Sequence, residues 1–261
     1  MDRTDDQLLQ QPRICETARH RYSVGFARGD DEVRAAQQLR WRVFAEELGA
    51  RLPSRTPGID RDFFDPYCEH LVVREESHGE VVGTYRVLSP KAARRIGCYS
   101  SENEFDLTRL QLLRERIVEI GRSCIHPQHH NGVVIALLWA GLGRYMLTSG
   151  HAYLVGCASM SMADGGQAAA SVFERLRARH LAPVEYRVFP RHGLPIDGLE
   201  CGVACEAPPL VRGYLRAGAW ICGDPAWDPD FNTADFLLFL PLSRLHPRFA
   251  RHFFGEVLRV G

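Results

Sequence analysis

The sequence lacks an excess of charge of either sign, and it lacks any apolar run long enough to cross a membrane. Its 32 basic residues balance 32 acidic ones, which excludes the global positive charge typical of nucleic-acid-binding proteins. The longest apolar runs, such as ADFLLFLPL at residues 234–242, fall well short of the about 18 residues that a membrane span needs. The first residues, MDRTDDQLLQQPR, are polar and acidic, so we expect no signal peptide.

Disulfide and metal patterns are also sparse for a chain of 261 residues. Eight cysteines stand at scattered positions, which disfavours a disulfide framework and favours reduced thiols in the cytoplasm. Cys201 and Cys205, with His192 upstream, do not have the tight spacing of a four-ligand zinc site, so no metal is predicted. Residues 1–20 lack periodicity, and we expect them to form a flexible tail.

Hydrophobic periodicity predicts an alternation of strands and helices from residue 21 onward. The order is β-α-β-β-β-α-β-α-β, followed by an extension from about residue 200 that ends in a strand and a basic amphipathic helix. We therefore predict an α+β fold with a mixed, twisted central sheet of about seven strands flanked by helices, in a single domain over residues 21–261. The predicted strands are 21–28, 70–75, 80–89, 116–125, 151–159, 184–190 and 233–242, and the predicted helices are 30–50, 131–150, 164–180, 208–220 and 244–260.

Short motifs follow one another in a definite order. They are RWRVF with Arg40 and Phe44, DFFD with Asp62 and Asp65, GTYR with Gly83 and Arg86, Phe105, and EIGR with Glu119 and Arg122. This order resembles that of the acyl-homoserine-lactone synthases, which have the GNAT-like N-acyltransferase fold. Longer stretches such as VEIGRSCIHP and LLWAGLGRYM are similar to the bacterial L-ornithine Nα-acyltransferases, and this resemblance covers about residues 21–255.

The resemblance implies transfer of a 3-hydroxyacyl chain from acyl carrier protein to the α-amine of L-ornithine, which gives lyso-ornithine lipid. It implies no permanently bound cofactor, because the donor is the phosphopantetheine arm of the carrier protein. The enzyme is expected in the cytoplasm. A peripheral contact with the inner face of the cytoplasmic membrane is a further expectation, since the amphiphilic product must go there.

The acyl donor is expected along the strand 116–125 and at the start of the helix behind it. The resemblance places it against Ser123, Cys124, Ile125, His130, Asn131 and Gly132. The superfamily loop is usually Gln/Arg-x-x-Gly-x-Gly/Ala, and its backbone N–H groups cradle a pyrophosphate. Here HHNGVV (129–134) keeps only Gly132. Such a loop fits acyl carrier protein, which offers a single phosphodiester in place of the pyrophosphate of acyl-CoA.

Glu119 and Arg122 are the predicted catalytic residues. An α-amine attacks a thioester only when neutral, and it is mostly protonated near pH 7, so a base is needed and Glu119 is the candidate. On a regular strand Glu119 and Arg122 would face opposite sides. We expect Gly121 to host a bulge that re-aims both side chains and leaves a backbone N–H for the thioester oxygen. The alternative is a surface ion pair on an edge strand, which would contribute little.

The predicted acceptor-binding residues carry charges of both signs, with carboxylates suited to an ammonium and arginines suited to a carboxylate. They are Arg40, Asp62, Asp65, Arg86, Asp228 and Asp230. For Asp228 and Asp230, the capping of turns is an equal alternative. Arg94, Arg95 and the HPQHH segment (126–130) are candidates to receive the acidic carrier protein.

Other functions stay open. An acyl-homoserine-lactone synthase would use S-adenosylmethionine as acceptor, although the long segment after residue 200 argues against it. An acyltransferase for glycine or another amino acid fits the same residues. A non-catalytic module that binds the carrier protein or a membrane fits the loop with few glycines, whereas the Glu119–Arg122 pair argues against it.

Overall fold

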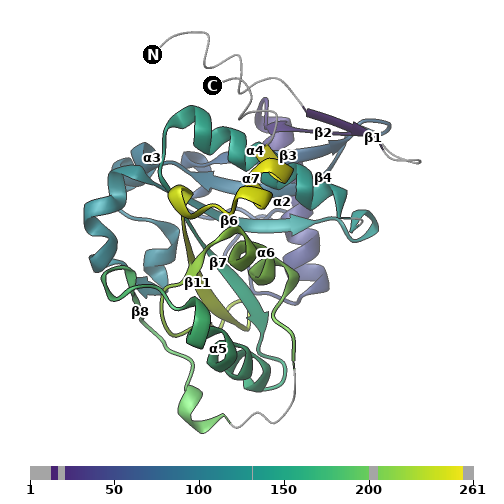
Figure 1. Cartoon of the computed structure of the whole chain (residues 1–261). Coiled ribbons are helices and arrows are strands. Elements are labelled where there is room, and N and C mark those ends of the chain that lie inside the picture. The colour runs from purple at the N-terminus through teal and green to yellow at the C-terminus, as the bar shows by residue number, and fades with distance from the viewer. Residues whose placement is uncertain (1–12, 17–20, 131, 200–204, 255–261) are drawn as a thin grey trace. The chain divides into compact units, whose positions relative to one another are not determined.

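The computed structural model describes residues 13–16, 21–130, 132–199 and 205–254 (Figure 1). Asn131 and Cys201 therefore lie outside the described residues. The backbone separates into two compact units, the first comprising residues 1–88, 120–151 and 250–261 and the second 89–119 and 152–249. Strand β6 (Ile117–Ile125) supplies residues to both units, with the boundary after Glu119. The single domain over 21–261 stays a prediction.

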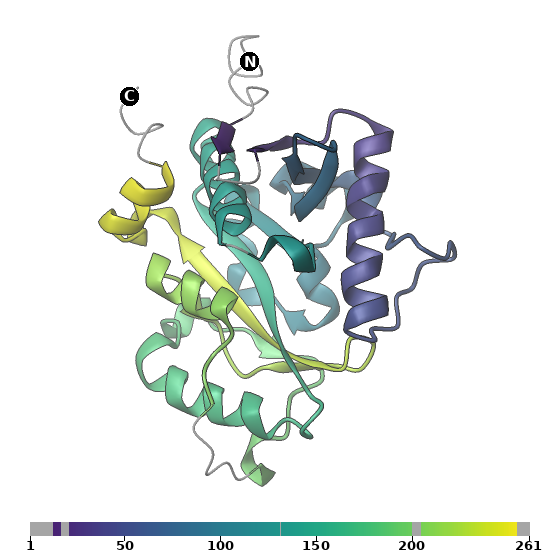
Figure 2. The same ribbon diagram turned by 90° about the vertical axis from the view of Figure 1, so that its right-hand side faces the viewer.

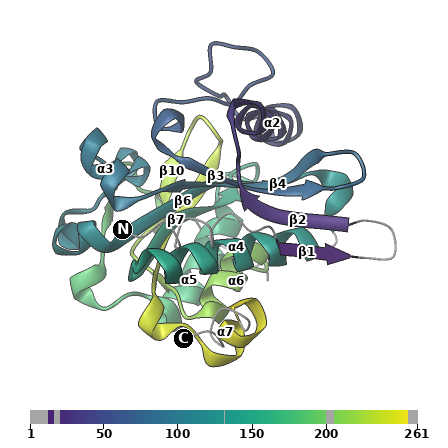
Figure 3. The same ribbon diagram turned by 90° about the horizontal axis from the view of Figure 1, so that it is seen from above.

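The first unit is a sheet with a helix on each face. Its elements are β1 (Arg13–Glu16), β2 (Arg21–Phe26), α2 (Asp30–Trp41), a π-helical turn (Arg42–Glu47), β3 (Glu69–Glu75), β4 (Glu80–Leu88), the second part of β6, and α4 (Val133–Ser149). The strands are hydrogen-bonded in the order β1-β2-β3-β4-β6. Figure 2 shows α2 and the long loop that follows it. Figure 3 shows α2 on one face of β3 and β4 and α4 on the other.

The burial of strand β3 shows that helices must pack on both faces of the sheet. All its residues after Glu69 are buried, and β4 is buried over most of its length. Such uninterrupted burial is typical of a strand with packing on both sides, whereas a half-exposed strand alternates. Gly83 lets α4 lie directly on β4, because a Cβ there would come within 2.5 Å of Val134 Cγ1. The glycine of the GTYR motif is therefore a packing requirement.

The second unit is built on the antiparallel pair β7–β11. Its elements are α3 (Pro90–Ile96), β5 (Phe105–Asp106), the start of β6, β7 (Tyr153–Ser161), α5 (Gln167–His180), β8 (Phe189–Pro190), α6 (Pro209–Ala217), β9 (Trp220–Ile221), β10 (Ala226–Asp228) and β11 (Thr233–Pro241). Residues Ile117–Glu119 of β6 run parallel to β7, and β9 and β10 both pair with β11. Helix α5 packs on β7 and α6 on β11. The closing helix α7 (Pro247–Phe254) has residues in both units.

The predicted α+β class with a mixed sheet is confirmed. Within the described residues, nine strands are linked to one another by strand pairing, whereas about seven are predicted. The additional strands are short. Strand β1 forms where a tail is predicted, and it pairs antiparallel with β2. The predicted strand 184–190 forms a strand only at β8, because Val184–Tyr186 form a 3-10 turn after Pro183. No helix in the described ranges combines the length and apolarity that crossing a membrane requires.

Helix α3 lies between the predicted strands 80–89 and 116–125, where no helix is predicted. Ser89 caps it, since its Oγ accepts a hydrogen bond from the Ala92 N–H at 3.2 Å. Pro90 occupies the first turn, and Gly97 ends the helix with a φ of 95°. These are ordinary start and stop signals, and the short basic run between them lacks the apolar periodicity on which the prediction relied.

Replacing Gly83 with alanine tests the close approach of α4 to β4. The added methyl must displace Val134, a stiff β-branched side chain, so we expect Gly83→Ala to lower the free energy of unfolding by about 1–3 kcal/mol. Urea denaturation of the full chain measures this change. Gly198→Ala is the matched control, because no atom lies within 4 Å of its Cβ position. Equal stability of the two variants would contradict the close-packing argument.

Candidate active site

Strand β6 has an unusual backbone conformation at Arg122. This residue has a φ of 50°, in the left-handed region that side chains other than glycine rarely occupy. Gly121, at which a bulge is predicted, has no positive φ and no atom within 4 Å of its Cβ position. The positive φ lies at the next residue, and the interactions of the Arg122 side chain must compensate for its backbone. The bulge at Gly121 stays a prediction.

Glu119 is held by backbone donors in the second unit. Its carboxylate accepts hydrogen bonds from the N–H groups of Ser100 at 2.6 Å and Ser101 at 2.7 Å. Both donors belong to the start of a short 3-10 helix (Ser100–Asn103), where N–H groups point outward and favour negative charge. Glu119 is only 5% exposed. Glu119 is therefore not a surface residue, and two main-chain N–H groups contribute to the orientation of its carboxylate.

Arg122 belongs to a buried ion-pair network in the first unit. The network consists of three arginines and three aspartates: Arg40, Arg86, Arg122, Asp60, Asp62 and Asp65. Arg40 Nε donates to Asp60 at 2.8 Å and its Nη2 to Asp65 at 2.5 Å. Arg86 Nη1 contacts Asp62 at 2.6 Å and Asp65 at 3.1 Å. Arg122 Nη2 completes the set with Asp62 at 3.3 Å.

Exposure increases from one end of this network to the other. The side chains of Arg40 and Asp60 are fully buried, whereas those of Asp62 and Arg122 are 12% and 18% exposed. Burial alone would raise the pKa of Asp65, but the guanidiniums of Arg40 and Arg86 outweigh it and hold that pKa well below its usual range. The charges of the network thus balance internally, and its Asp62–Arg122 end is the more accessible to a substrate.

The four predicted acceptor-binding residues of the first unit are brought together by this network. Arg40, Asp62, Asp65 and Arg86 contact one another, and Asp60 joins them without having been predicted. The repeated aspartates of IDRDFFD are the signal that could have identified it. Whether these residues bind an acceptor stays a prediction.

Asp228 caps a turn in the second unit. Its Oδ1 accepts hydrogen bonds from the N–H groups of Asp230 at 2.8 Å and Phe231 at 3.1 Å. The structure therefore shows the turn-capping alternative for Asp228, in which Asp230 takes part through its backbone. Binding of an ammonium by either carboxylate stays a prediction.

The predicted donor-binding residues that the structure describes, which exclude Asn131, lie on β6 and before α4, within the first unit. His130 Nε2 is 2.9 Å from the carbonyl oxygen of Ile125, which ties the loop back to the strand. Gly132 caps α4 with a φ of 79°. Burial raises the pKa of the Cys124 thiol to about 12, so it does not supply a thiolate nucleophile near neutral pH. The neighbouring Ser123 is partly exposed.

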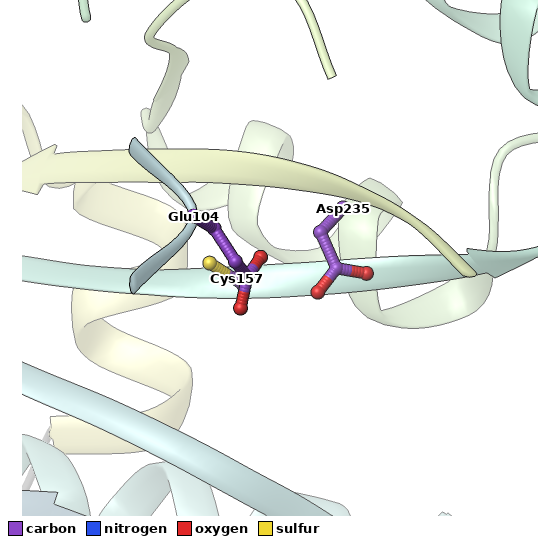
Figure 4. Close-up of side chains that lie close together, drawn as sticks. All are labelled: Glu104, Cys157 and Asp235. Atoms are coloured by element: carbon purple, nitrogen blue, oxygen red, sulfur yellow. The ribbon is translucent and has the colours of Figure 1, made fainter. Parts of the chain in front are cut away.

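A cluster of Glu104, Cys157 and Asp235 in the second unit is a site that the sequence analysis missed. Figure 4 shows the carboxylate of Glu104 directed at Cys157 on β7 and near that of Asp235 on β11. Burial and the adjacent Asp235 raise the pKa of Glu104 to about 9, so the two carboxyl groups share a proton at neutral pH. Burial likewise raises the pKa of Cys157 well above that of a free thiol.

This cluster is the group of described residues whose donor atoms suit a metal ion, with the atoms within 4.8 Å of one another. Three donors fall short of the four that structural zinc requires, and Cys157 would have to lose its proton. Cys205, considered above for a zinc site, instead directs its thiol at the carbonyl oxygen of Ala168 at 3.3 Å. The absence of a metal stays a prediction.

The strain at Arg122 can be measured with two variants that both remove its guanidinium. Arg122→Ala keeps a side chain at a φ of 50°, whereas Arg122→Gly relieves it. We expect the glycine variant to be more stable than the alanine variant by about 1 kcal/mol, although glycine loses more entropy on folding. Thermal and urea denaturation measure the difference. If the alanine variant is the more stable, the left-handed backbone stores no strain.

The shared proton of Glu104 predicts a pH dependence of stability. The pKa of Glu104 is raised from an ordinary 4.5 to about 9, so the folded chain holds a proton that the unfolded chain releases. The free energy of unfolding is therefore expected to fall as pH rises between about 5 and about 9. Glu104→Gln cannot ionise and should flatten this decline in urea denaturation across that range. The exposed Glu174→Gln serves as the control, and parallel pH profiles for wild type and Glu104→Gln would refute the assignment.

Comparison with known proteins gives consistent matches. The model of an acetyltransferase (GNAT) domain matches residues 39–140. The L-ornithine N(alpha)-acyltransferase of Agrobacterium fabrum is 34% identical over 251 residues, which cover 90% of this chain and 85% of that protein. The protein of the same name from Rhodobacter capsulatus is 35% identical, with 87% and 94% of the two chains covered.

Solved structures of similar fold are more distant in sequence. The AHL synthase LasI is 15% identical, with a TM-score of 0.50 and coverage of 94% of this chain and 96% of that one. FeeM, an N-acyl amino acid synthase from uncultured soil microbes, is 12% identical, with a TM-score of 0.51 and coverage of 87% and 94%. At these identities the likeness shows the fold alone.

Proposed function

The chain belongs to the L-ornithine N(alpha)-acyltransferase family and has the GNAT fold, and from this premise we propose that it acylates the α-amine of L-ornithine with a 3-hydroxyacyl chain from acyl carrier protein. The coarser activity, N-acylation of an amino acid, is that of the family. The product of the proposed reaction is a lyso-ornithine lipid. The observation that supports it best is the orientation of Glu119 by two backbone N–H groups.

Glu119 is the proposed general base. The α-ammonium of the acceptor must lose a proton before its nitrogen can attack the thioester carbon. Formation of the C–N bond gives a tetrahedral intermediate, whose collapse breaks the C–S bond and leaves the amide. The nitrogen loses two protons between ammonium and amide: one balances the proton that the departing phosphopantetheine thiolate gains, and the other is released to solvent. A carboxylate with its orientation fixed before the substrate arrives suits this step, because no reorganisation is needed.

Arg122 and Asp62 are the proposed contacts for the acceptor in the first unit. A guanidinium binds a carboxylate and a carboxylate binds an ammonium, and ornithine carries both kinds of group. They form the more exposed end of the ion-pair network, whereas Arg40 is fully buried. We assign Arg40, Arg86 and Asp65 the task of positioning this end. The proposed contact for the thioester oxygen is a backbone N–H of segment 119–122.

The donor is proposed to dock its phosphopantetheine arm along Ser123–Ile125 and at the start of α4. The N-terminus of a helix attracts a phosphodiester through its outward N–H groups. His130, tied to the carbonyl oxygen of Ile125, is near enough in the chain to add a donor. Arg94 and Arg95 on α3 are exposed and remain the proposed contacts for the acidic carrier protein.

Replacement of Glu119 tests the proposed function. Purified protein is given 3-hydroxyacyl-carrier protein together with ornithine, lysine, glycine or S-adenosylmethionine, and products are detected by mass. We expect Nα-acyl-ornithine, and a loss on the order of 10²-fold or more in kcat for Glu119→Gln because the base is removed. Glu174→Gln, on the exposed face of α5, is the matched control and should keep the wild-type rate.

Three other results of this assay would each contradict a different part of the proposal. A homoserine-lactone product from S-adenosylmethionine would replace the proposed acceptor. An undiminished rate for Glu119→Gln would remove Glu119 as the base while leaving the acyl transfer intact. No amide with any amine, despite measurable binding of the carrier protein, would leave a non-catalytic carrier-binding module.

A further inference from the structure

Three large apolar side chains stand exposed close together in the second unit. Leu112 is 97% exposed, Val184 62% and Phe189 58%. Large apolar side chains that gather in water at one place mark an interaction surface more often than scattered ones do. We refer to these three residues, together with Arg109, as the Leu112 patch.

Contacts made by Arg109 show that the patch is continuous. Its Nη1 donates a hydrogen bond to the carbonyl oxygen of Val184 at 2.9 Å, and its guanidinium lies 5.0 Å from the centre of the Phe189 ring. Arg109 and Leu112 belong to the same 3-10 helix (Thr108–Arg116), in which residues three apart lie on one side. Leu112 therefore projects from the side on which Arg109 meets Val184 and Phe189.

Positive charge borders this patch. Helix α3 packs against the 3-10 helix and carries the exposed Lys91, Arg94 and Arg95, with no acidic residue within it. Arg191, also exposed, follows β8 directly. Three exposed carboxylates accompany these five basic groups, counting Arg109: Glu115, which pairs with Arg94 at 3.4 Å, Asp106, which accepts from Thr108 N–H at 2.8 Å, and Glu185. The border is thus positive on balance.

We propose that the Leu112 patch is a peripheral docking surface for an anionic lipid membrane. Exposed apolar side chains beside a guanidinium match the boundary between acyl chains and phosphate headgroups, where Leu and Phe enter and Arg stays at headgroup depth. A protein partner would instead need shape complementarity over a much larger area. The proposal rests on the proposed function in one respect: the acyl product is amphiphilic and must pass from the enzyme into a bilayer.

Vesicle sedimentation with the full chain tests the patch. The probes are phosphatidylcholine vesicles with and without phosphatidylglycerol, at low and high salt. We expect the wild type to bind the anionic vesicles, to bind them less at high salt, and to bind the neutral ones weakly. The double variant Leu112→Ser, Phe189→Ser should lose at least about tenfold in affinity, because both apolar contacts are removed. Leu48→Ser, at a leucine of the first unit that is 68% exposed, should bind as the wild type.

A second measurement separates the membrane from the carrier protein. The rate with acyl-carrier protein in vesicle-free solution should be the same for the double variant and the wild type. A higher KM for the acyl-carrier protein, with vesicle binding unchanged, would overturn the proposal and make the patch a carrier contact. Failure of the wild type to bind anionic vesicles would also overturn it. Vesicle binding through the patch in a protein that acylates no amine would uphold the docking surface and reject only the proposed function.

Discussion

The structure of the first unit depends on one fully buried guanidinium, that of Arg40. Arg40 carries a permanent positive charge into the interior, where an unpaired ion costs several kcal/mol. Asp60 and Asp65 compensate for it, and both come from the irregular segment after α2 rather than from the sheet. The ion pairs of Arg40 therefore hold in place the segment around Asp60 and Asp65, which belongs to no α-helix or strand.

The same charges connect segments that are far apart in the sequence. Asp65 contacts Arg86 on β4, and Asp62 contacts both Arg86 and Arg122 on β6. Removing any one member leaves an uncompensated charge on another, so the six side chains act as a unit. The left-handed backbone of Arg122 is tolerated because this network holds its guanidinium.

The sequence predicts the fold well where apolar periodicity is strong. Helices α2, α4 and α5 and strands β3, β4, β6, β7 and β11 all appear near their expected positions. It fails where a helix has few apolar residues, as in α3, and where a strand is too short to have a period, as in β1, β9 and β10. In both cases tertiary contacts or caps stabilise the element, and no periodic pattern reports them.

The sequence predicts which residues belong to the site, but not which of them contact one another. Sequence order indicates that Arg40, Asp62, Asp65 and Arg86 matter, but it does not show that they neutralise one another. Glu104 and Asp235 stand more than a hundred positions apart, so their shared proton depends on a contact that the chain order does not reveal. The positive φ in β6 lies at Arg122 and not at the neighbouring glycine, and the ion pairs of the Arg122 guanidinium, which the sequence does not reveal, offset its cost.

The contact between Gly83 and Val134 has a consequence for the start of α4. Val134 is the second residue of this helix, so the separation of the helix start from β4 is set by the radii of carbon atoms in contact. A separation fixed in this way does not respond to ionic strength, in contrast to the charge-held segment after α2. A change of salt concentration should therefore disturb the start of α4 less than it disturbs the segment after α2.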